Sequence, residues 1–599
     1  MPAYQAPVEE VLFLLNDVFH IDRHANLPGF ADATPDVVRA LLEENARLCA
    51  EVLQPLNQSG DKQGCTRAAD GAVTAPAGFG DAYRLFAEGG WIGLAADPEY
   101  GGQGLPYTLA AIVNEFVTAA NMSFGMYPGL TQGAIAAILK HGSGELKSLY
   151  LPKMIAGTWS GTMNLTEPHC GTDLGLLRTK AAKNGDGSYA ISGTKIFISA
   201  GEHDLTENIV HLVLARIEGA PEGTKGISLF VVPKFIPDEK GEPGKRNAVT
   251  CGSIEHKMGI HGNATCVMNY DGATGWLIGE ADKGMRAMFT MMNEARLGVG
   301  IQGLALSDVA YQNALAYARE RLQGRSLSGV KAPGKPADPI IVHPDIRRML
   351  MNMKAFNEAA RALVVWTALR GDVAERSQDE KERQRGEDHM GLLTPVIKGV
   401  LTDTGFRNTV EAQQVYGGHG YIAEWGMEQF VRDARIAMIY EGANGIQALD
   451  LVGRKLPANG GRALMGFFKE VDAFLAENKD SGDEAMNPVL AALKAGRGDL
   501  EKATGWLMNN AMKKPDNAGA AAMDYMQMFG LVALCFMWAK MVRAAGEKLA
   551  AGEGDGALYR AKQVTARYFA ERMMPETAAH LARISAGADA MMALEPDAF

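Results

Sequence analysis

With 599 residues the chain is too long for one hydrophobic core, and its 47% hydrophobic and 22% charged residues are typical of a globular protein with two to four domains. Its net charge of −11, spread along the sequence, argues against a protein built mainly to hold nucleic-acid phosphates. The six cysteines show no CxxC pair and no metal-ligand spacing. We therefore expect free thiols, no metal site and a reducing, cytoplasmic compartment.

Residues 1–159 predict an N-terminal helical domain. Apolar residues recur three or four positions apart in Val8, Val11, Leu12 and Leu15, and a second such stripe begins at Val37. The first residues carry no basic region followed by an apolar stretch, so no signal peptide is expected.

Residues 160–284 predict a middle antiparallel β domain. Short runs rich in β-branched residues, such as 209–214 and 227–232, alternate with turn signals such as the Asn-Gly-Asp-Gly sequence at 184–187.

Helical periodicity returns beyond residue 284. Residues 285–456 predict a C-terminal domain of the four-helix type, and residues 462–599, beyond a Pro- and Gly-containing hinge, predict an additional C-terminal helical domain. The apolar run 526–542 is interrupted by Gly530 and Lys540 and is too short to span a bilayer, so it predicts a buried helix and no membrane partner.

Three motifs carry groups suited to a ligand. At 163–173 (MNLTEPHCGTD) a β-like run ends in hydroxyls, Pro and Gly, where backbone amides can bond the edge of a planar heteroaromatic ring. The motif at 195–199 (KIFIS) adds an aromatic and a hydroxyl, although such a run is also ordinary β-core. At 414–421 (QVYGGHGY) glycines after a helix let the backbone approach a diphosphate. No strand precedes this cluster and it is not GxGxxG, so a Rossmann site is not predicted.

Glu441 lies in a short glycine-containing turn between an apolar run and a helix-like segment at 446–456. A carboxylate in such a turn can be aimed into a cavity and partly desolvated, which makes it more basic. The alternative is that Glu441 only complements the positive end of the following helix.

In this order, on a helix–β–helix layout, these four motifs resemble the acyl-CoA dehydrogenase flavoprotein family over about residues 13–457. The resemblance implies a mostly α fold with an N-terminal α domain, a middle β-barrel-like domain and a C-terminal helix bundle, followed here by the extra helical region. It also implies FAD as cofactor, an acyl-CoA thioester as substrate and an electron-transferring flavoprotein as electron acceptor.

The resemblance assigns roles to individual residues. The positions that match FAD contacts of the family are Met163, Leu165, Thr166, Gly171, Thr172, Phe197, Ile198, Ser199, Arg321, Gln414, Gly417, Gly418, Ala443 and Asn444. Those that match acyl-CoA contacts are Thr172, Asn293, Arg296 and Gly442. Because the 414–418 turn matches contacts to the FAD of a neighbouring subunit, a homo-oligomer (dimer or tetramer) is expected. The match weakens after Arg321, where the Phe-Gly step of the family is absent and its Gln aligns with Pro344.

Glu441 matches the catalytic base of the family. Some members carry the base on an upstream helix, in the position that Ala295 occupies here. The adjacent Glu294 is about 100° around a helix from that position, so it should miss the site. In the implied reaction, Glu441 removes the α-proton of the thioester while a hydride leaves the β-carbon for flavin N5, giving a trans-2-enoyl-CoA. A backbone N–H and a ribityl hydroxyl stabilise the enolate.

The N-terminal segment, the insert at 326–338 and the extra C-terminal region together resemble a subgroup of the family that acts on 3-methylmercaptopropionyl-CoA in dimethylsulfoniopropionate breakdown, yielding methylthioacryloyl-CoA. This resemblance rests on layout, so a general short- or medium-chain acyl-CoA dehydrogenase remains an alternative. A further alternative is a protein of the same fold whose C-terminal extension binds duplex DNA. It predicts a basic extension, whereas residues 462–599 carry about 16 basic and 18 acidic side chains.

Overall fold

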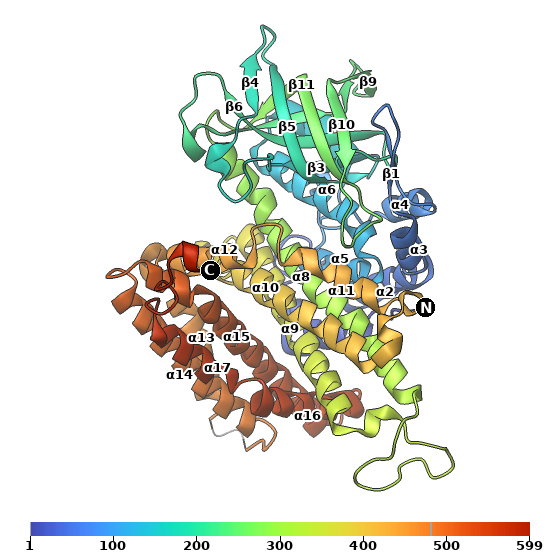
Figure 1. Cartoon of the computed structure of the whole chain (residues 1–599), viewed down its shortest axis with the longest axis vertical. Coiled ribbons are helices and arrows are strands. Elements are labelled where there is room, and N and C mark those ends of the chain that lie inside the picture. The colour runs from blue at the N-terminus through green and yellow to red at the C-terminus, as the bar shows by residue number, and fades with distance from the viewer. Residues whose placement is uncertain (1, 480–481) are drawn as a thin grey trace. The chain divides into compact units, whose positions relative to one another are not determined.

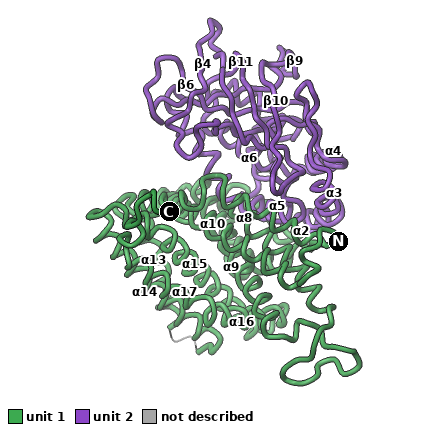
Figure 2. The backbone as a smooth tube through the Cα atoms, in the orientation of Figure 1, with its two compact units in different colours: residues 1–39, 299–599 green, residues 40–298 purple. Residues whose placement is uncertain are grey.

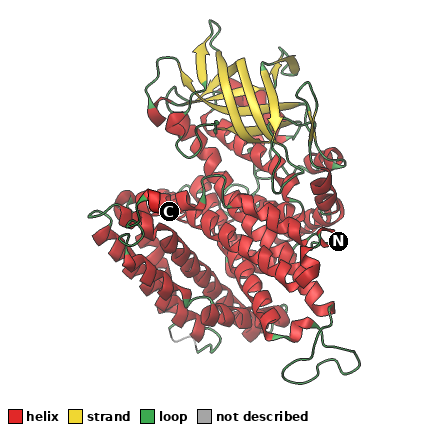
Figure 3. Ribbon diagram, viewed as in Figure 1, coloured by secondary structure: helices red, strands yellow, loops and turns green. Residues whose placement is uncertain are grey.

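Helices dominate the computed structural model, and its one large sheet lies between Trp159 and Ile278 (Figure 3). The structure describes residues 2–479 and 482–599. They form two units, residues 40–298 and residues 1–39 with 299–599 (Figure 2). The predicted fold class, mostly α with a middle β domain and an additional C-terminal helical region, is confirmed. The finer division into four domains remains a prediction.

The unit 40–298 begins within α2 and ends within α8, and its other helices are short and amphipathic or largely buried. The helices are α2 (Pro35–Leu48), α3 (Pro55–Gln63), α4 (Phe79–Glu88), α5 (Tyr107–Ala120), α6 (Met122–His141), α7 (Gly144–Ile155) and α8 (Gly284–Glu320). Their ends are encoded locally, since Asn121 caps α6 by accepting from the Phe124 N–H at 3.0 Å and Ser143 caps α7 at Leu146.

The β domain is a seven-stranded sheet in the order β10-β11-β5-β4-β6-β3, with β7 paired to both β11 and β6 (Figure 1). Its strands are β3 (Trp159–Asn164), β4 (Lys180–Lys183), β5 (Tyr189–Ser199), β6 (Asn208–Ile217), β7 (Ser228–Pro233), β10 (Val249–Ile254) and β11 (Thr265–Ile278). Two hairpins, β1 (Thr66–Arg67) with β2 (Val73–Thr74) and β8 (Phe235–Pro237) with β9 (Pro243–Arg246), stand apart. Most pairs are antiparallel as expected, but β6 runs parallel to β3 and β4. A parallel pair needs a long crossover, which single-strand patterns do not reveal.

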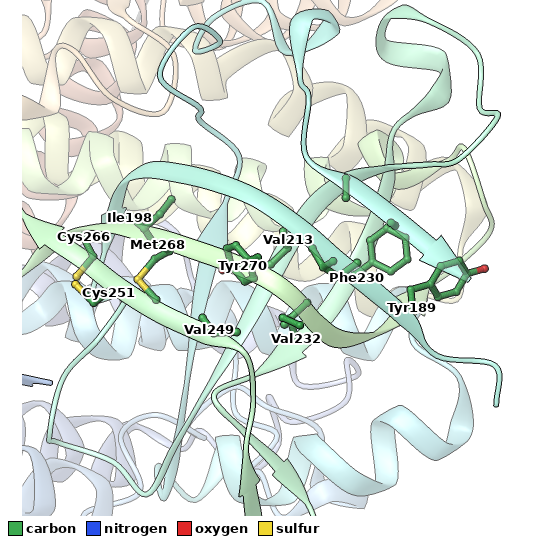
Figure 4. Packing of buried hydrophobic residues seen from close by; sticks show 14 of the residues in the cluster. Tyr189, Ile198, Val213, Phe230, Val232, Val249, Cys251, Cys266, Met268 and Tyr270 are labelled. Atoms are coloured by element: carbon green, nitrogen blue, oxygen red, sulfur yellow. The ribbon is translucent and has the colours of Figure 1, made fainter. Parts of the chain in front are cut away.

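A hydrophobic cluster fills the interior of the β domain (Figure 4). Tyr189 and Phe230 meet edge to face with ring centroids 5.0 Å apart, and Ile198 is 2% exposed. Cys251 and Cys266 are buried in the same cluster as free thiols. The side chains that point into this core determine which strand positions are left to face outward.

The second unit is helical throughout. Before the C-terminal extension its helices are α1 (Val8–Phe13), the remainder of α8, α9 (Pro344–Arg376), α10 (Glu380–Val415), α11 (Met427–Ala437) and α12 (Asn444–Asp450). The extension contributes α13 (Arg462–Glu477), α14 (Asn487–Asn510), α15 (Asp516–Ala551), α16 (Gly556–Arg572) and α17 (Glu576–Ala586).

Helix α15 forms the centre of the extension. It packs against α14, α16 and α17 on one side and against α9, α10 and α12 on the other. The expectation that the run 526–542 is too short to span a bilayer is wrong, because α15 has 36 residues and is long and apolar enough to cross a membrane. However, 83% of its apolar window is buried inside the protein. Met526, Phe529 and Trp538 are fully buried, so the prediction of a buried helix at 526–542 is confirmed.

A buried ion cluster ties the first helix to α9 and to the extension. Glu10 accepts from Arg361 Nη1 at 2.9 Å and lies 3.3 Å from Lys562 Nζ. Burial raises the pKa of Glu10, but Lys562 and Arg361 outweigh burial and lower that pKa to about 2. The charged carboxylate therefore stabilises the folded chain above the ordinary pKa of a glutamate, and this contribution is lost as the pH falls towards 2.

We expect Glu10→Gln to destabilise the protein by about 2 kcal/mol at pH 7, because each of the two buried cations loses one of its two carboxylate partners. Lys562 keeps Glu358, and Arg361 keeps Asp308. Thermal unfolding followed by circular dichroism measures the loss. The difference in stability between wild type and Glu10→Gln should become smaller below about pH 4.5, because the charged carboxylate contributes less to the stability of wild type as the pH falls. Glu9→Gln is the matched control, since Glu9 has an exposed side chain. Equal midpoints for wild type and Glu10→Gln at pH 7 would contradict the prediction.

Candidate functional site

Phe197 lies in a β-bulge that turns its ring out of the core. Along the β5–β11 ladder, Ile198 pairs with Cys266 and Lys195 with Met268, so two residues of β5 face one residue of β11. Phe197 has a φ of +59°, a conformation that is costly for a residue with a side chain. Its side chain is 60% exposed. The bulge thus presents an aromatic ring on the surface of the β domain, two residues before the half-buried Ser199.

The 163–173 loop is tied to this bulge by a buried ion pair. Lys195 Nζ donates to Glu167 Oε1 at 2.9 Å and to the Leu165 carbonyl at 3.0 Å. The Ile196 N–H donates to the Thr166 carbonyl at 2.9 Å. The structure therefore brings the predicted flavin residues of the loop next to those of β5. Of the loop residues, Met163, Leu165 and Thr166 are half-buried, while Gly171 and Thr172 are exposed.

Glu167 and Lys195 support the candidate site as a buried ion pair, and the sequence analysis did not single them out. Burial raises the pKa of Glu167, but Lys195, the Thr179 hydroxyl and the Arg178 N–H outweigh burial and hold that pKa below its ordinary value. Burial lowers the pKa of Lys195 to about 8 despite Glu167. The pair is therefore charged at neutral pH. The available signal was a glutamate inside the 163–173 motif and the lysine that begins the 195–199 motif.

The Glu441 turn connects α11 to α12 and is held through its backbone. Glu441 has a φ of +55° and Gly442 a φ of +85°, and both residues are half-buried. Gln447 Nε2 donates to the Glu441 carbonyl at 2.9 Å, and Lys398 Nζ donates to the Gly442 carbonyl at 2.8 Å. A Cβ at Gly442 would come within 2.6 Å of Gln447, so the turn requires glycine there. These two bonds determine the course of the backbone without engaging the Glu441 carboxylate.

The side chain of Asn444, a predicted FAD contact, forms hydrogen bonds to residues of α10. Its amide Nδ2 donates to Asp403 Oδ1 at 2.6 Å and to Thr402 Oγ1 at 2.9 Å, and its Oδ1 accepts from Lys398 Nζ at 2.7 Å. The side chain therefore anchors the start of α12 to α10. A cofactor contact at Asn444 would come from its backbone, as at the half-buried neighbour Ala443.

The predicted contacts at the C-terminal end of α10 are on the surface. Gln414, Gly417 and Gly418 are exposed, and a Cβ added to either glycine would meet open space. Gln414 lies about 17 Å along α10 from Asp403, by the rise of an α-helix. Within one chain, this group is therefore separate from the Glu441 turn.

Arg321 belongs to the same group. It is exposed and follows the end of α8, where the Tyr317 ring stacks on Tyr416 with centroids 4.1 Å apart. The Tyr317 hydroxyl is 2.9 Å from His419 Nδ1. The structure thus brings the helix end before Arg321 next to the glycine turn at 417–418.

Asn293, Glu294 and Arg296 lie on the part of α8 that belongs to the unit 40–298. Asn293 is exposed, Glu294 and Arg296 are half-buried, and the Arg296 guanidinium lies 5.8 Å from the centre of the Phe289 ring. Glu441 belongs to the other unit. The substrate contacts of Asn293 and Arg296, and the choice of Glu441 over Glu294, therefore remain predictions.

Four family models match consecutive stretches of the chain. They are described as acyl-CoA dehydrogenase N-terminal domain (residues 37–158), middle domain (162–273) and C-terminal domain (282–456), and acetyl-CoA dehydrogenase C-terminal like (467–595). Together they cover nearly the whole chain, including the extension.

Characterised proteins are similar along the same length. A 3-methylmercaptopropionyl-CoA dehydrogenase of Ruegeria pomeroyi is 43% identical, over 98% of this chain and 99% of its own. The broad-specificity linear acyl-CoA dehydrogenase FadE5 of Mycobacterium tuberculosis is 34% identical, over 96% of each chain. The structure of an acyl-CoA dehydrogenase from Bacillus anthracis complexed with FAD matches with a TM-score of 0.74 at 22% identity, over 92% of this chain and 88% of that one.

We expect Glu167→Gln to loosen the 163–173 loop, because the buried Lys195 ammonium loses its counter-charge. Hydrogen–deuterium exchange of peptides covering this loop should accelerate about tenfold, the equivalent of 1.4 kcal/mol in local opening. Glu218→Gln, at an exposed glutamate of the same domain, is the control. Unchanged exchange in Glu167→Gln would show that the pair does not hold the loop.

Proposed function

Because the chain belongs to the acyl-CoA dehydrogenase family of FAD-dependent oxidoreductases, we propose that it oxidises 3-methylmercaptopropionyl-CoA to methylthioacryloyl-CoA. The family that the four motifs predicted is confirmed by models covering its N-terminal, middle and C-terminal domains. The choice of acyl group is supported by 43% identity over 98% of the chain to the Ruegeria pomeroyi enzyme.

The observation that carries the proposed chemistry is the Glu441 turn. In the proposed reaction the Glu441 carboxylate takes the α-proton of the thioester. A carboxylate can take the proton as a general base, and the turn that carries this one is half-buried. The backbone N–H of Glu441 is assigned to the enolate oxygen, where a waiting donor stabilises the developing charge.

The residues of the β domain fit the flavin that the family requires. The exposed Phe197 ring offers an apolar face, while Thr166, Ser199 and the loop backbone offer hydrogen-bonding groups beside it. We assign Met163, Leu165, Gly171 and Thr172 to the same contact surface. The Ile198 side chain is buried in the core of the β domain, so the predicted flavin contact at this residue would come from its backbone alone. FAD, when bound, supplies the acceptor for the hydride that leaves the β-carbon.

The group at the end of α10 is proposed to serve a neighbouring subunit. Gln414, Gly417, Gly418 and Arg321 are exposed, and Gln414 lies about 17 Å along α10 from Asp403, which binds the start of α12 through Asn444. Open space above both glycines would let a diphosphate approach the backbone. This arrangement supports a homo-oligomer. An electron-transferring flavoprotein is the proposed electron acceptor, as the family resemblance implies.

A general short- or medium-chain acyl-CoA dehydrogenase is the second candidate function. It is favoured by 34% identity over 96% of the chain to FadE5, whose name describes a broad-specificity enzyme for linear acyl-CoAs. The values of kcat/KM for 3-methylmercaptopropionyl-CoA, butyryl-CoA and octanoyl-CoA decide between the two. The primary proposal predicts at least a tenfold preference for the thioether substrate. Equal values for all three would favour the second candidate.

We expect Glu441→Gln to retain FAD and its yellow colour but to lose at least 1,000-fold in kcat, because the amide cannot accept the α-proton. Turnover with an artificial electron acceptor measures the loss. Glu294→Gln is the comparison variant and should keep most of the activity. If Glu441→Gln stays active and Glu294→Gln does not, the base is on α8 instead.

A further inference from the structure

We propose that the C-terminal extension positions the catalytic base, and that Gln527 on α15 is the positioning residue through which it does so. The inference rests on the proposed role of Glu441. It gives a function to the C-terminal extension, which supplies none of the residues proposed for the acyl-CoA dehydrogenase reaction itself. All the residues involved lie within the unit formed by residues 1–39 and 299–599.

A continuous chain of hydrogen bonds leads from α15 to the Glu441 turn. Gln527 Nε2 donates to Asp403 Oδ2 at 2.8 Å, and Asp403 Oδ1 accepts from Asn444 Nδ2 at 2.6 Å. Asn444 in turn accepts from Lys398, whose ammonium also holds the Gly442 carbonyl next to Glu441. Each oxygen of the Asp403 carboxylate thus binds one element, α12 on one side and α15 on the other.

Side chains packed against two glycines fix where α15 contacts α10. A Cβ at Gly399 would come within 2.3 Å of Met526, and a Cβ at Gly530 would come within 2.6 Å of Val400. The two helices can approach this closely because Gly399 and Gly530 have no side chain. The contact falls within one turn of Lys398 and Asp403 on α10, and Met526 is adjacent to Gln527. The amide of Gln527 is consequently held in place by packing as well as by its hydrogen bond.

The Asp403 carboxylate needs this partner. Burial raises the pKa of Asp403 above its ordinary value. The Asn444 amide and the nearby Arg407, Lys398 and Arg435 lower this pKa, but they do not outweigh burial. A partly buried carboxylate without one of its donors would either take up a proton or move towards water. Either change would weaken its bond to Asn444 and so loosen the start of α12, which Thr402 and Lys398 also hold. The Glu441 turn immediately precedes that start.

The proposed reaction depends on the position of the Glu441 carboxylate, because this group must lie close to the α-proton of the substrate in order to remove it. A displacement of about 1 Å by a change far from the chemistry can cost about 100-fold in rate. Removing the Gln527 donor should therefore slow proton abstraction while leaving FAD and acyl-CoA binding intact. A role confined to stability would change the melting temperature without changing the chemical step.

The test compares Gln527→Met with Gln563→Met in the full-length FAD-loaded protein. Methionine has nearly the length of glutamine but donates no hydrogen bond, and Gln563 is likewise half-buried in the extension, on α16. Gln527→Ala, which needs no additional space, replaces Gln527→Met if that variant does not fold. Flavin content, KM, and the rate of anaerobic flavin reduction by acyl-CoA with and without deuterium at the α-carbon are measured for each protein.

We expect the reduction rate of Gln527→Met to fall 10- to 100-fold with an increased α-deuterium isotope effect, while KM and flavin content stay within about twofold of wild type. Gln563→Met should match wild type. The proposal would be overturned if both variants were reduced as fast as wild type. It would also be overturned if the reduction rate fell equally in both. If wild type is reduced and Glu441→Gln is not, the proposed function stands whatever Gln527→Met shows. If no acyl-CoA reduces wild type, the proposed function itself fails, and the role of Gln527 with it.

Discussion

The buried ammonium of Lys398 holds together the part of the molecule on which the proposed chemistry depends. It is fully buried, and a buried charge is tolerated only where hydrogen-bond acceptors replace water. Two of those acceptors are the Gly442 carbonyl and Asn444 Oδ1. The solvation of this one cation is thereby coupled to the path of the Glu441 turn. A rearrangement of the turn that moves these two oxygens would therefore weaken the solvation of the ammonium.

The β domain repeats this arrangement with different residues. Phe197 and Glu441 are two of only seven non-glycine residues in the described ranges with a positive φ. Each is adjacent to a segment held by a buried lysine, Lys195 in one case and Lys398 in the other. A left-handed residue costs about 1–3 kcal/mol and persists only where its surroundings enforce it. In both places the enforced conformation presents a side chain that the proposed reaction uses, a ring beside the flavin or a carboxylate beside the substrate.

Much of this could be predicted from the sequence. The periodicities predicted the helical and β-rich regions, and four short motifs in order predicted the family, because each motif is local in sequence. The bulge at Phe197, the Lys195–Glu167 pair and the bonds from Lys398 to Gly442 could not be predicted in the same way. The ion pair joins residues 28 positions apart, the Lys398–Gly442 bond joins residues 44 apart, and the bulge depends on the pairing of Ile198 with Cys266, 68 positions away. Register and burial are set by the packed fold. The parallel pairing of β6 with β3 and β4 escaped prediction for the same reason.

The most direct test of the account is the visible spectrum of the purified protein during anaerobic titration with 3-methylmercaptopropionyl-CoA. The account predicts that the oxidised flavin band bleaches as substrate is added, that the enoyl-CoA product forms in step, and that neither change occurs in Glu441→Gln. A flavin band that stays unbleached with this substrate, with butyryl-CoA and with octanoyl-CoA would contradict the account. The protein would then have this fold and cofactor but a different function.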